Sequence, residues 1–228
     1  GGCKVVVVEE RPYLGGRARS FVDRESGDEI DNGQHVMMGC YHDVLRMVRE
    51  LGTEHLLERQ RALRVAFVDT VGRHDVLDAS RLPGRAGVAA GLLGLRGIGF
   101  RSRLAGLRLA LRISRGTATG KGLTCADFLR HHDQPHDIIT RFWEPIVLAT
   151  LNAPLEHASA DLLVEVMRLA FLGTTEDSQL LIPTAGLSAL LAPFNEWIGG
   201  KGGRVQTSTS IDNLLIRNGV VESALLSN

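Results

Sequence analysis

The feature that most constrains the fold is the start of the chain, where Val5 to Val8 form an unbroken run of β-branched residues. Such a run is typical of a strand buried on both faces of a parallel sheet. Glu9 and Glu10 follow directly, where such a strand reaches the carboxyl edge at which open α/β folds bind their ligands. A carboxylate there can accept two hydrogen bonds from ribose hydroxyls, each worth on the order of 1.5–3 kcal/mol when partly desolvated.

A glycine pair strengthens this nucleotide hypothesis. Gly15, Gly16 and Arg17 come shortly after the acidic pair. Paired glycines let the backbone approach a ligand closely, and a guanidinium beside them is suited to a pyrophosphate. The alternative is a core strand, a solvated glutamate pair and a plain turn. Acid, double glycine and arginine in this order are more than a strand needs, so we favour the nucleotide site.

Three segments of the sequence resemble a known group of proteins. VVVVEERPYLGGRARS resembles the second strand and following segment of the flavin amine oxidase and phytoene desaturase superfamily. Two longer segments, DNGQHVMMGCYHDVLRMVRELG (31–52) and FWEPIVLATLNAPLEHASADL (142–162), resemble the squalene-associated FAD-dependent desaturases, the hydroxysqualene dehydroxylases in particular. The resemblance covers nearly the whole chain.

The resemblance implies an α/β fold with an α+β insertion. A partial Rossmann-like FAD-binding domain of amine oxidase type is expected at 1–61 and 181–228, with a largely helical substrate and membrane domain inserted at 62–180. The residues carried over from the family to the FAD site are Glu9, Gly15, Gly16, Arg17, Gly33, Gln34, His35 and Ile211. Taken alone, His35 is equally interpreted as a hydrogen-bonded core histidine.

The position of Glu9 leads to an expectation about the ends of the chain. A dinucleotide fold places its ribose acid roughly 20 residues beyond a glycine-rich fingerprint. Here the acid is the ninth residue. We therefore expect a fragment that begins inside its cofactor domain and, by resemblance, also lacks the C-terminal part. We expect these 228 residues to retain FAD weakly or not at all.

Local patterns predict a series of elements. Apolar spacing predicts a helix over 41–52, which Gly52 ends, and Thr124 with Asp127 predicts a capped helix after it. Hairpins are predicted for 19–23 with 29–36, for 65–69 with 74–77, and for 211–217 with 220–226 across Asn218-Gly219. Further predictions are a helix beginning after Pro145, a helix over 160–173, a helix over 187–198 kinked at Pro193, and strands at 180–183 and 204–208.

The middle of the chain is strongly basic. Between Ala79 and Ala126 there is no acidic residue, and the segment holds nine basic ones. On a helix, Arg101, Arg108, Arg112 and Arg115 fall on one side, with leucines elsewhere around the helix. The segment 96–115 fits an element lying at a membrane surface, and the alternative is a core helix with a solvated arginine face.

Composition limits the class of protein. Zero formal net charge over 228 residues argues against a nucleic-acid binder. Cys3, Cys40 and Cys125 have no CxxC spacing, which indicates free thiols in a reducing compartment. The sequence has no signal peptide and no apolar window of about 20 residues. We expect a cytoplasmic protein, peripheral on the inner face of the membrane.

The chemistry is expected to come from a cofactor, because the sequence holds no GxSxG motif and no cysteine with a plausible base. No metal site is predicted: adjacent His131 and His132 cannot share one helix face, and Gln134-Pro135 indicates a loop. Glu144 is either an acid with a raised pKa or a helix-end charge. Neither it, His35 nor Tyr41 is singled out as catalytic.

By resemblance the reaction is the reductive removal of the hydroxyl of hydroxysqualene, giving squalene for hopanoid or related lipid synthesis, with FAD as cofactor. Two alternatives remain open. One is a carotenoid (phytoene-type) desaturase or amine oxidase-like flavoenzyme. The other is a non-catalytic prenyl-lipid-binding module of the same fold.

Overall fold

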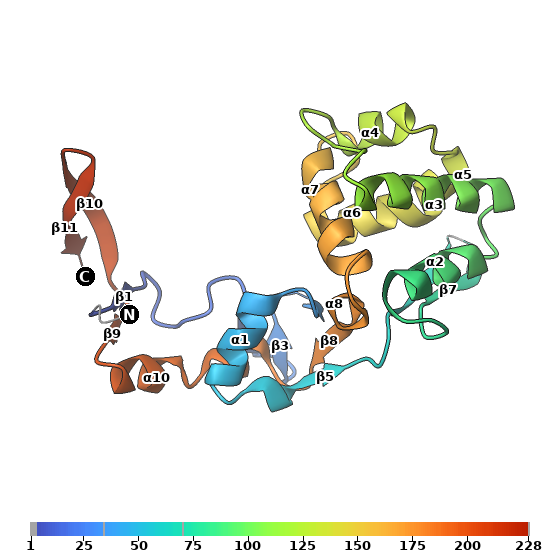
Figure 1. The fold of residues 1–228 in the computed structure, drawn as a ribbon. Coiled ribbons are helices and arrows are strands. Elements are labelled where there is room, and N and C mark those ends of the chain that lie inside the picture. The colour runs from blue at the N-terminus through green and yellow to red at the C-terminus, as the bar shows by residue number, and fades with distance from the viewer. Residues whose placement is uncertain (1–3, 34, 70, 228) are drawn as a thin grey trace. The chain divides into compact units, whose positions relative to one another are not determined.

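The computed structural model describes residues 4–33, 35–69 and 71–227 (Figure 1). The chain divides into two compact units. The first, here called the mixed unit, comprises Gly1–Val36, His42–Glu58 and Ile182–Asn228. The second, the helical unit, comprises Met37–Tyr41 and Arg59–Leu181.

The mixed unit is built on three two-stranded sheets. β1 pairs with β9 in parallel, whereas β2 with β3 and β10 with β11 are antiparallel hairpins. Its elements are β1 (Val6–Val8), β2 (Ser20–Val22), β3 (Glu29–Asp31), α1 (His42–Glu50), η1 (Glu54–Leu56), α9 (Leu187–Leu191), α10 (Phe194–Gly200), β9 (Arg204–Gln206), β10 (Ser210–Arg217) and β11 (Val220–Ser227).

The first strand corrects one prediction. β1 lies in a parallel pair, as predicted, and its partner is β9, with Val6 opposite Arg204. However, Val5 is 44% and Val6 is 46% exposed, so the prediction that both faces of the strand are buried is wrong. The physical reason is that β1 belongs to a sheet of only two strands, which leaves its faces open.

Helices α1, α9 and α10 follow from their sequences. α1 buries Leu45 and Val48, and Gly52 follows it with a φ of +74°, which confirms the helix that the glycine ends. The helix predicted over 187–198 with a kink at Pro193 forms as two helices, so the interruption lies at the predicted proline but is a break rather than a kink. α9 ends at Leu191 and α10 begins at Phe194, because Pro193 between them has no N–H to continue the hydrogen-bond ladder.

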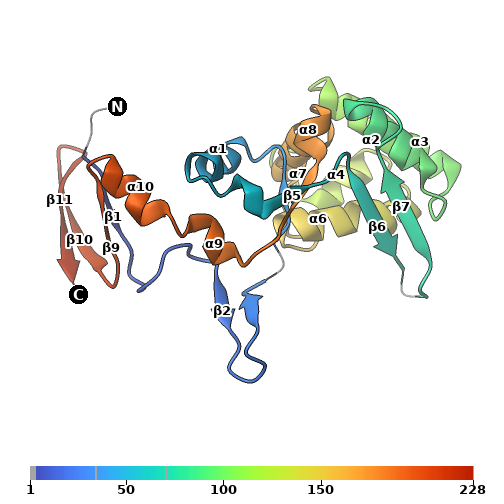
Figure 2. The same cartoon turned by 90° about the horizontal axis from the view of Figure 1, so that it is seen from below.

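The helical unit packs its helices around the main hydrophobic core, beside the hairpin β6–β7 (Figure 2). Trp143, Phe128 and Phe142 are the largest fully buried side chains. Its elements are β6 (Arg64–Val68), β7 (His74–Asp78), α2 (Gly84–Gly94), α3 (Phe100–Ser114), α4 (Cys125–His131), α5 (His136–Ile138), η2 (Ile139–Trp143), α6 (Glu144–Leu151), α7 (Ala160–Val166), η3 (Met167–Phe171) and α8 (Thr175–Ser178).

A three-stranded sheet contains the strands at which the chain passes between the units. It has the order β4-β8-β5, with β4 at Met37–Met38, β5 at Leu57–Arg59 and β8 at Leu180–Pro183. Met37 lies opposite Leu181 in the antiparallel pair β4–β8. The short stretch Met37–Tyr41 belongs to the helical unit, which no sequence pattern indicated.

Several local predictions are confirmed. The hairpins β2–β3, β6–β7 and β10–β11 form as expected, and Thr124 Oγ1 accepts the N–H of Asp127 at 3.1 Å at the start of α4. The prediction that a helix begins after Pro145 is wrong. The backbone is already helical from His136, and a wider π-helical turn, η2, precedes Pro145. Proline lacks an N–H and its ring crowds the preceding turn, which a π-turn relieves.

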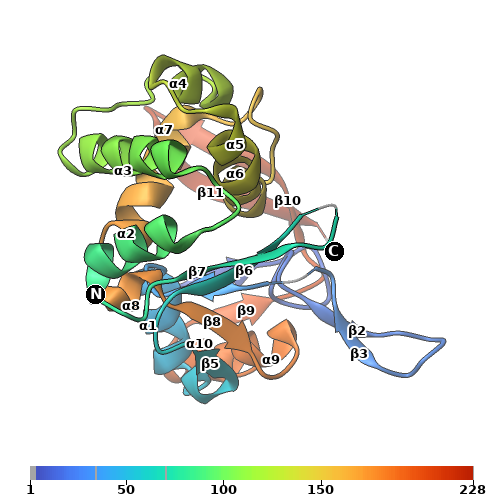
Figure 3. The same cartoon turned by 90° about the vertical axis from the view of Figure 1, so that its right-hand side faces the viewer.

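Helix α2 lies against β7 through its glycines, as Figure 3 shows for the two elements. A Cβ added at Gly87 would overlap the carbonyl oxygens of Leu82 and Ala79, and one at Gly91 would lie 3.1 Å from the Asp78 carbonyl oxygen. At Gly94, in the same helix, a Cβ would meet nothing within 4 Å. Gly87 therefore sets the distance between α2 and the segment that follows β7.

We predict that Gly87→Ala lowers the free energy of unfolding by about 1–3 kcal/mol, because the added methyl group must displace backbone rather than a flexible side chain. Gly94→Ala is the matched control and is expected to be neutral or stabilising by about 0.5–1 kcal/mol, since alanine is the better helix former. Urea denaturation of both variants measures the difference. Equal stability of the two variants would contradict the close packing at Gly87.

Candidate cofactor site

The carboxyl end of β1 meets β9 at the predicted ribose acid. The Glu9 N–H donates to the Gln206 carbonyl at 2.9 Å, and the Glu9 carbonyl accepts the Thr209 N–H at 3.0 Å. Glu9 is thus fixed where β1 and β9, the two parallel strands labelled in Figure 1, both end. Ile211 follows two residues after Thr209, on β10, with a side chain that is 51% exposed. The structure therefore brings the backbones of Glu9 and the Ile211 strand into one corner.

Two side chains of this corner carry hydrogen-bond acceptors. The Glu9 Oε1 atom accepts the Arg11 N–H at 2.8 Å. Within the described part of the chain, the buried Gln206 Oε1 atom has no hydrogen-bond partner. A buried acceptor without a donor is costly unless something supplies one. Sequence reasoning missed Gln206, since a glutamine on a short strand carries no pattern of its own.

The glycine pair forms a tight turn in the loop after β1. Gly15 has a φ of +109° and Gly16 of +56°, and the Ala18 N–H donates to the Gly15 carbonyl at 2.9 Å. A Cβ at Gly15 would lie 2.5 Å from the Ala18 oxygen, so glycine is required there. Arg17 is exposed beside the turn.

The loop around this turn is ordered by an aromatic ring. The Arg19 guanidinium lies 3.7 Å from the centre of the Tyr13 ring, and Arg11 donates to the Tyr13 hydroxyl at 3.3 Å. A Cβ at Gly15 would also lie 3.6 Å from Leu191 of α9. The described contacts therefore join the glycine turn to α9, and they show no direct contact between this turn and the Glu9 side chain.

The third predicted segment follows β3. His35 Nε2 lies 3.4 Å from the Asn32 Oδ1 atom, and a Cβ at Gly33 would lie 3.6 Å from the same nitrogen. Gln34, the remaining predicted residue, lies outside the described residues. Gly33 and His35 therefore lie together, next to the hairpin β2–β3.

A hydrogen-bond network fixes this hairpin to α9. Asp31 Oδ1 accepts the Ser20 hydroxyl at 2.7 Å and the Leu187 N–H at 3.0 Å, and the Ser188 N–H donates to Ser20 Oγ at 3.0 Å. A Cβ at Gly186 would lie 2.6 Å from Ser20 Oγ. The network places the segment after Asp31 at the start of α9. Sequence reasoning missed it, although opposed polar residues on β2 and β3 were a possible signal.

The hydrogen bond from Ser20 lowers the pKa of Asp31 below its ordinary value, and the Leu187 N–H adds to this shift. Asp31 is therefore ionised at neutral pH and accepts both bonds as a carboxylate. Its charge lies in the same short segment as the two predicted flavin-lining residues.

Comparison with known proteins gives the family. Residues 1–223 match the family described as "Flavin containing amine oxidoreductase". The chain belongs to this family. The superfamily resemblance of the sequence is thereby confirmed, and FAD is the cofactor that membership supports.

Curated relatives of this amine oxidoreductase chain include enzymes named for isoprenoids. It is 28% identical to a zeta-carotene desaturase of Zea mays over 223 residues, which are 89% of the chain and 38% of the relative. It is 30% identical to a hydroxysqualene dehydroxylase of Sinorhizobium fredii over 219 residues, 93% of the chain and 49% of the relative. The chain thus spans half or less of the length of these two relatives.

Solved structures show the fold. A cyclohexylamine oxidase of Brevibacterium oxydans matches with a TM-score of 0.63 at 17% identity, over 99% of this chain and 51% of that one. A Rab GDI of Plasmodium falciparum matches with a TM-score of 0.51 at 13% identity, over 98% of this chain and 57% of that one. The α/β FAD-binding fold of amine oxidase type is therefore confirmed, but these structural matches show the fold alone.

The residues of this family member fit FAD at two points. The buried Gln206 Oε1 atom beside Glu9 lacks a hydrogen-bond donor, and a ribose hydroxyl or the adenine amino group can supply one. The glycine turn has open space at Gly16, where a Cβ would meet nothing within 4 Å, so a ligand can approach the backbone there. Glu9, Gln206, Gly15 and Gly16 are thus the candidates for holding the adenosine diphosphate part.

Other reactive groups do not form a site. Burial raises the pKa of Cys125 to about 11 and also raises the pKa of Cys40, so neither thiol is an activated nucleophile. Among the described residues, no three histidine, cysteine, aspartate or glutamate side chains are placed to hold a metal ion. Glu144 opens α6, but the backbone before it is helical too, so it does not lie at a free helix end.

We predict that Asp31→Asn lowers the free energy of unfolding at pH 6 by about 1 kcal/mol, because the carboxylate is a stronger acceptor than an amide. The pKa of Asp31 is lowered on folding, so its contribution is complete above the ordinary value of 3.8 and is lost as the pH falls through the lowered one.

The difference between the chain and Asp31→Asn should therefore shrink as urea denaturation is repeated at decreasing pH below 3.8. Asp28→Asn, on the turn of the same hairpin, is the control. A difference that is equally large at pH 6 and at the lowest pH would show that Asp31 does not act through its charge.

Proposed function

We propose that this chain is part of a FAD-dependent oxidoreductase that acts on a C30 isoprenoid, removing the hydroxyl of hydroxysqualene to give squalene. The observation that carries the cofactor part is the corner of Glu9 and Gln206, where two parallel strands end beside the unsatisfied Gln206 Oε1 acceptor. Such an edge is where open α/β sheets bind nucleotides.

The isoprenoid part is supported by relatives and by sequence segments. The Sinorhizobium fredii relative is named for hydroxysqualene, and the segments 31–52 and 142–162 resemble enzymes of that group. In the proposed reaction a hydride takes the place of the hydroxyl group on carbon. A proton joins the departing hydroxide, which leaves as water. Bound FAD supplies the hydride chemistry.

The protein residues bind and orient. Glu9 is proposed to accept hydrogen bonds from the ribose, and the Gly15–Gly16 turn with Arg17 to lie at the pyrophosphate. Gly33, Gln34 and His35 are proposed to line the flavin, and Ile211 to lie at the adenine. No described side chain is assigned as the proton donor.

Two other functions have specific support. A carotene desaturase is favoured by the Zea mays relative and would remove hydrogen from a polyene instead. A non-catalytic prenyl-lipid-binding module is compatible with the fold of the Plasmodium falciparum Rab GDI. The flavin absorbance spectrum of the full-length protein separates the last function from the first two.

We predict that the full-length protein carrying this sequence, kept anaerobic with FAD and a reductant, converts hydroxysqualene into squalene. Mass spectrometry of the extracted lipid measures the product. Zeta-carotene, offered in parallel with oxidised FAD, should stay unchanged. Loss of hydrogen from zeta-carotene without any squalene formation would replace the dehydroxylase proposal by the desaturase one.

Two glutamate variants, one test and one control, probe the cofactor site independently of the substrate. Glu9→Gln should weaken FAD binding by roughly tenfold, the value of one hydrogen bond to a charged group. Glu10→Gln, its exposed neighbour, should bind FAD normally. Unchanged FAD affinity in Glu9→Gln would remove Glu9 from the site whichever substrate is used.

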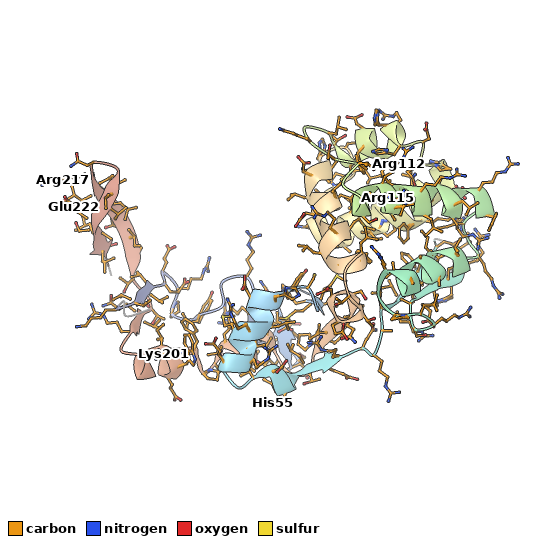
Figure 4. All side chains as sticks on the ribbon, in the orientation of Figure 1. His55, Arg112, Arg115, Lys201, Arg217 and Glu222 are labelled. Carbon is orange, nitrogen blue, oxygen red and sulfur yellow. The ribbon has the colours of Figure 1, made fainter. Side chains whose placement is uncertain are left out.

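We further propose that α3 docks on an anionic membrane at the cytoplasmic side. Its inward face buries Ser102, Gly106, Leu109 and Ile113. Arg101, Arg108, Arg112 and Arg115 are exposed, as are Phe100 at 61% and Leu111 at 48% (Figure 4 labels Arg112 and Arg115). Exposed arginines interleaved with exposed apolar side chains suit a lipid headgroup layer.

Docking would solve a transfer problem. Moving about thirty apolar carbons from a bilayer into water costs on the order of 20 kcal/mol, which excludes free diffusion of the substrate. No helix in the described part of the chain is long and apolar enough to span a bilayer. A surface contact is therefore the proposed mode.

We predict that replacing Arg101, Arg108 and Arg112 by Glu weakens binding to vesicles with anionic lipid by roughly 100-fold, at about 1 kcal/mol per charge. Flotation of the full-length protein with liposomes measures this. Reversal of three exposed arginines on other elements, Arg24, Arg61 and Arg64, is the matched control. Equal flotation of both variants would refute docking through α3.

A further inference from the structure

The helical unit contains a cavity of about 660 Å³ that the proposed reaction does not use. Its walls come from the ends of β6 and β7 nearest their turn, from the loop between α2 and α3, and from η2 with the start of α6. Phe67 of β6 lies opposite Asp75 of β7, so the two share a face, and the Phe67 ring lies 6.4 Å from that of Phe142. The cavity therefore lies on the helix-covered face of the hairpin.

The two carboxylates of this cavity already have donors. Asp69 accepts the Arg73 side chain at 2.7 Å and the N–H groups of Val71 and Arg73 at 3.1 and 2.9 Å. Asp75 accepts the Gly97 N–H at 2.7 Å and the Val76 N–H at 3.0 Å. Each carboxylate is thus committed to holding the wall together, and neither is free to bind a cation.

Two guanidinium groups remain available. Arg141 has only a distant ion pair with Asp69, at 3.8 Å. Arg96, on the α2–α3 loop, has no ion pair or hydrogen bond from its side chain to the described residues. The cavity is lined by three arginines and two aspartates, so it carries an excess of positive charge.

Arg141 is held in position by its neighbours. It lies on the π-helical turn η2, directly before two buried aromatic residues. Phe142 and Trp143 are buried, and the Trp143 Nε1–H donates to Gln134 Oε1 at 3.0 Å. A Cβ at Gly97 would lie 3.1 Å from an Arg141 nitrogen, so the loop approaches the guanidinium closely. π-turns are frequent at functional sites, where they set the direction of a side chain.

We propose that this cavity binds the phosphate or diphosphate group of an amphiphile, with Arg96 and Arg141 as its ligands. Guanidinium groups recognise phosphate oxygens through paired, charge-assisted hydrogen bonds. Phe67, Leu95, Ile98 and Pro145 supply an apolar wall for the attached hydrocarbon. The volume lies within the range of small-molecule sites. The proposal does not depend on flavin chemistry.

Calorimetry with decyl phosphate tests this on the full-length protein. One molecule should bind per chain, and Arg96→Gln and Arg141→Gln should each weaken binding about tenfold, the value of a hydrogen bond between charged groups. Arg24→Gln, an exposed arginine on the turn of the β2–β3 hairpin and outside the cavity, is the control and should bind as the parent does.

Two further probes identify which part of the ligand is recognised. Decanol, which has no charge, should bind at least tenfold more weakly, and so should inorganic phosphate, which has no chain. Equally tight binding of inorganic phosphate would make this a free-phosphate site, and equally tight binding of decanol would make it an apolar pocket. Either result overturns the proposal, as does unchanged decyl phosphate affinity in Arg96→Gln, whose exposed position keeps the fold intact.

Discussion

The candidate cofactor site depends on the parallel pairing of β1 with β9, because it alone positions Glu9. Nearly the whole chain lies between Val6 and its partner Arg204, so this contact forms only when both ends of the sequence meet. Contacts between residues so distant in sequence are entropically expensive to form. The hydrogen bonds of Glu9 with Gln206 and Thr209 extend the pairing by one step and fix the acid at the strand end. The helical unit is inserted between these two strands in sequence, yet the site needs none of its side chains.

Local features of the fold were predictable from sequence, whereas long-range polar contacts were not. The Asn218-Gly219 hairpin, the Thr124 cap and the strand end at Glu9 each follow from a few neighbouring residues. The Leu187 N–H donates to Asp31 from 156 positions away, and no local pattern contains both. The orphan acceptor of Gln206 was equally hidden, because burial without a partner is a property of the assembled corner. The sequence thus supplied candidate residues for the site, whereas Gln206 and the contacts that hold Asp31 came from the structure.

Pro145 is associated with a change in the helical turn that precedes it. A proline in an α-helix lacks an N–H and crowds the preceding turn, and here Pro145 follows a π-turn instead of starting a new helix. The sequence pattern suggested a helix start because prolines are common there. In the structure the helical backbone continues from His136, and the widened turn carries Arg141. The same local adjustment that accommodates the proline therefore sets the side chain that borders the cavity.

The arginines of the basic segment divide between two environments, which the neutral overall charge conceals. Those on the outer side of α3 face solvent among exposed apolar side chains. One of them, Arg112, lies 3.3 Å from His132 Nδ1. Arg96, just before the helix, borders the 660 Å³ cavity, whose aspartates are already bonded. Solvent screens the first group within about a Debye length, so only a dense anionic surface can hold it. Arg96 instead borders a cavity together with Arg141, and two guanidinium groups on one cavity can bind a single phosphate. The two proposals thus assign one basic stretch of sequence a broad contact on its surface and a narrow one beside it.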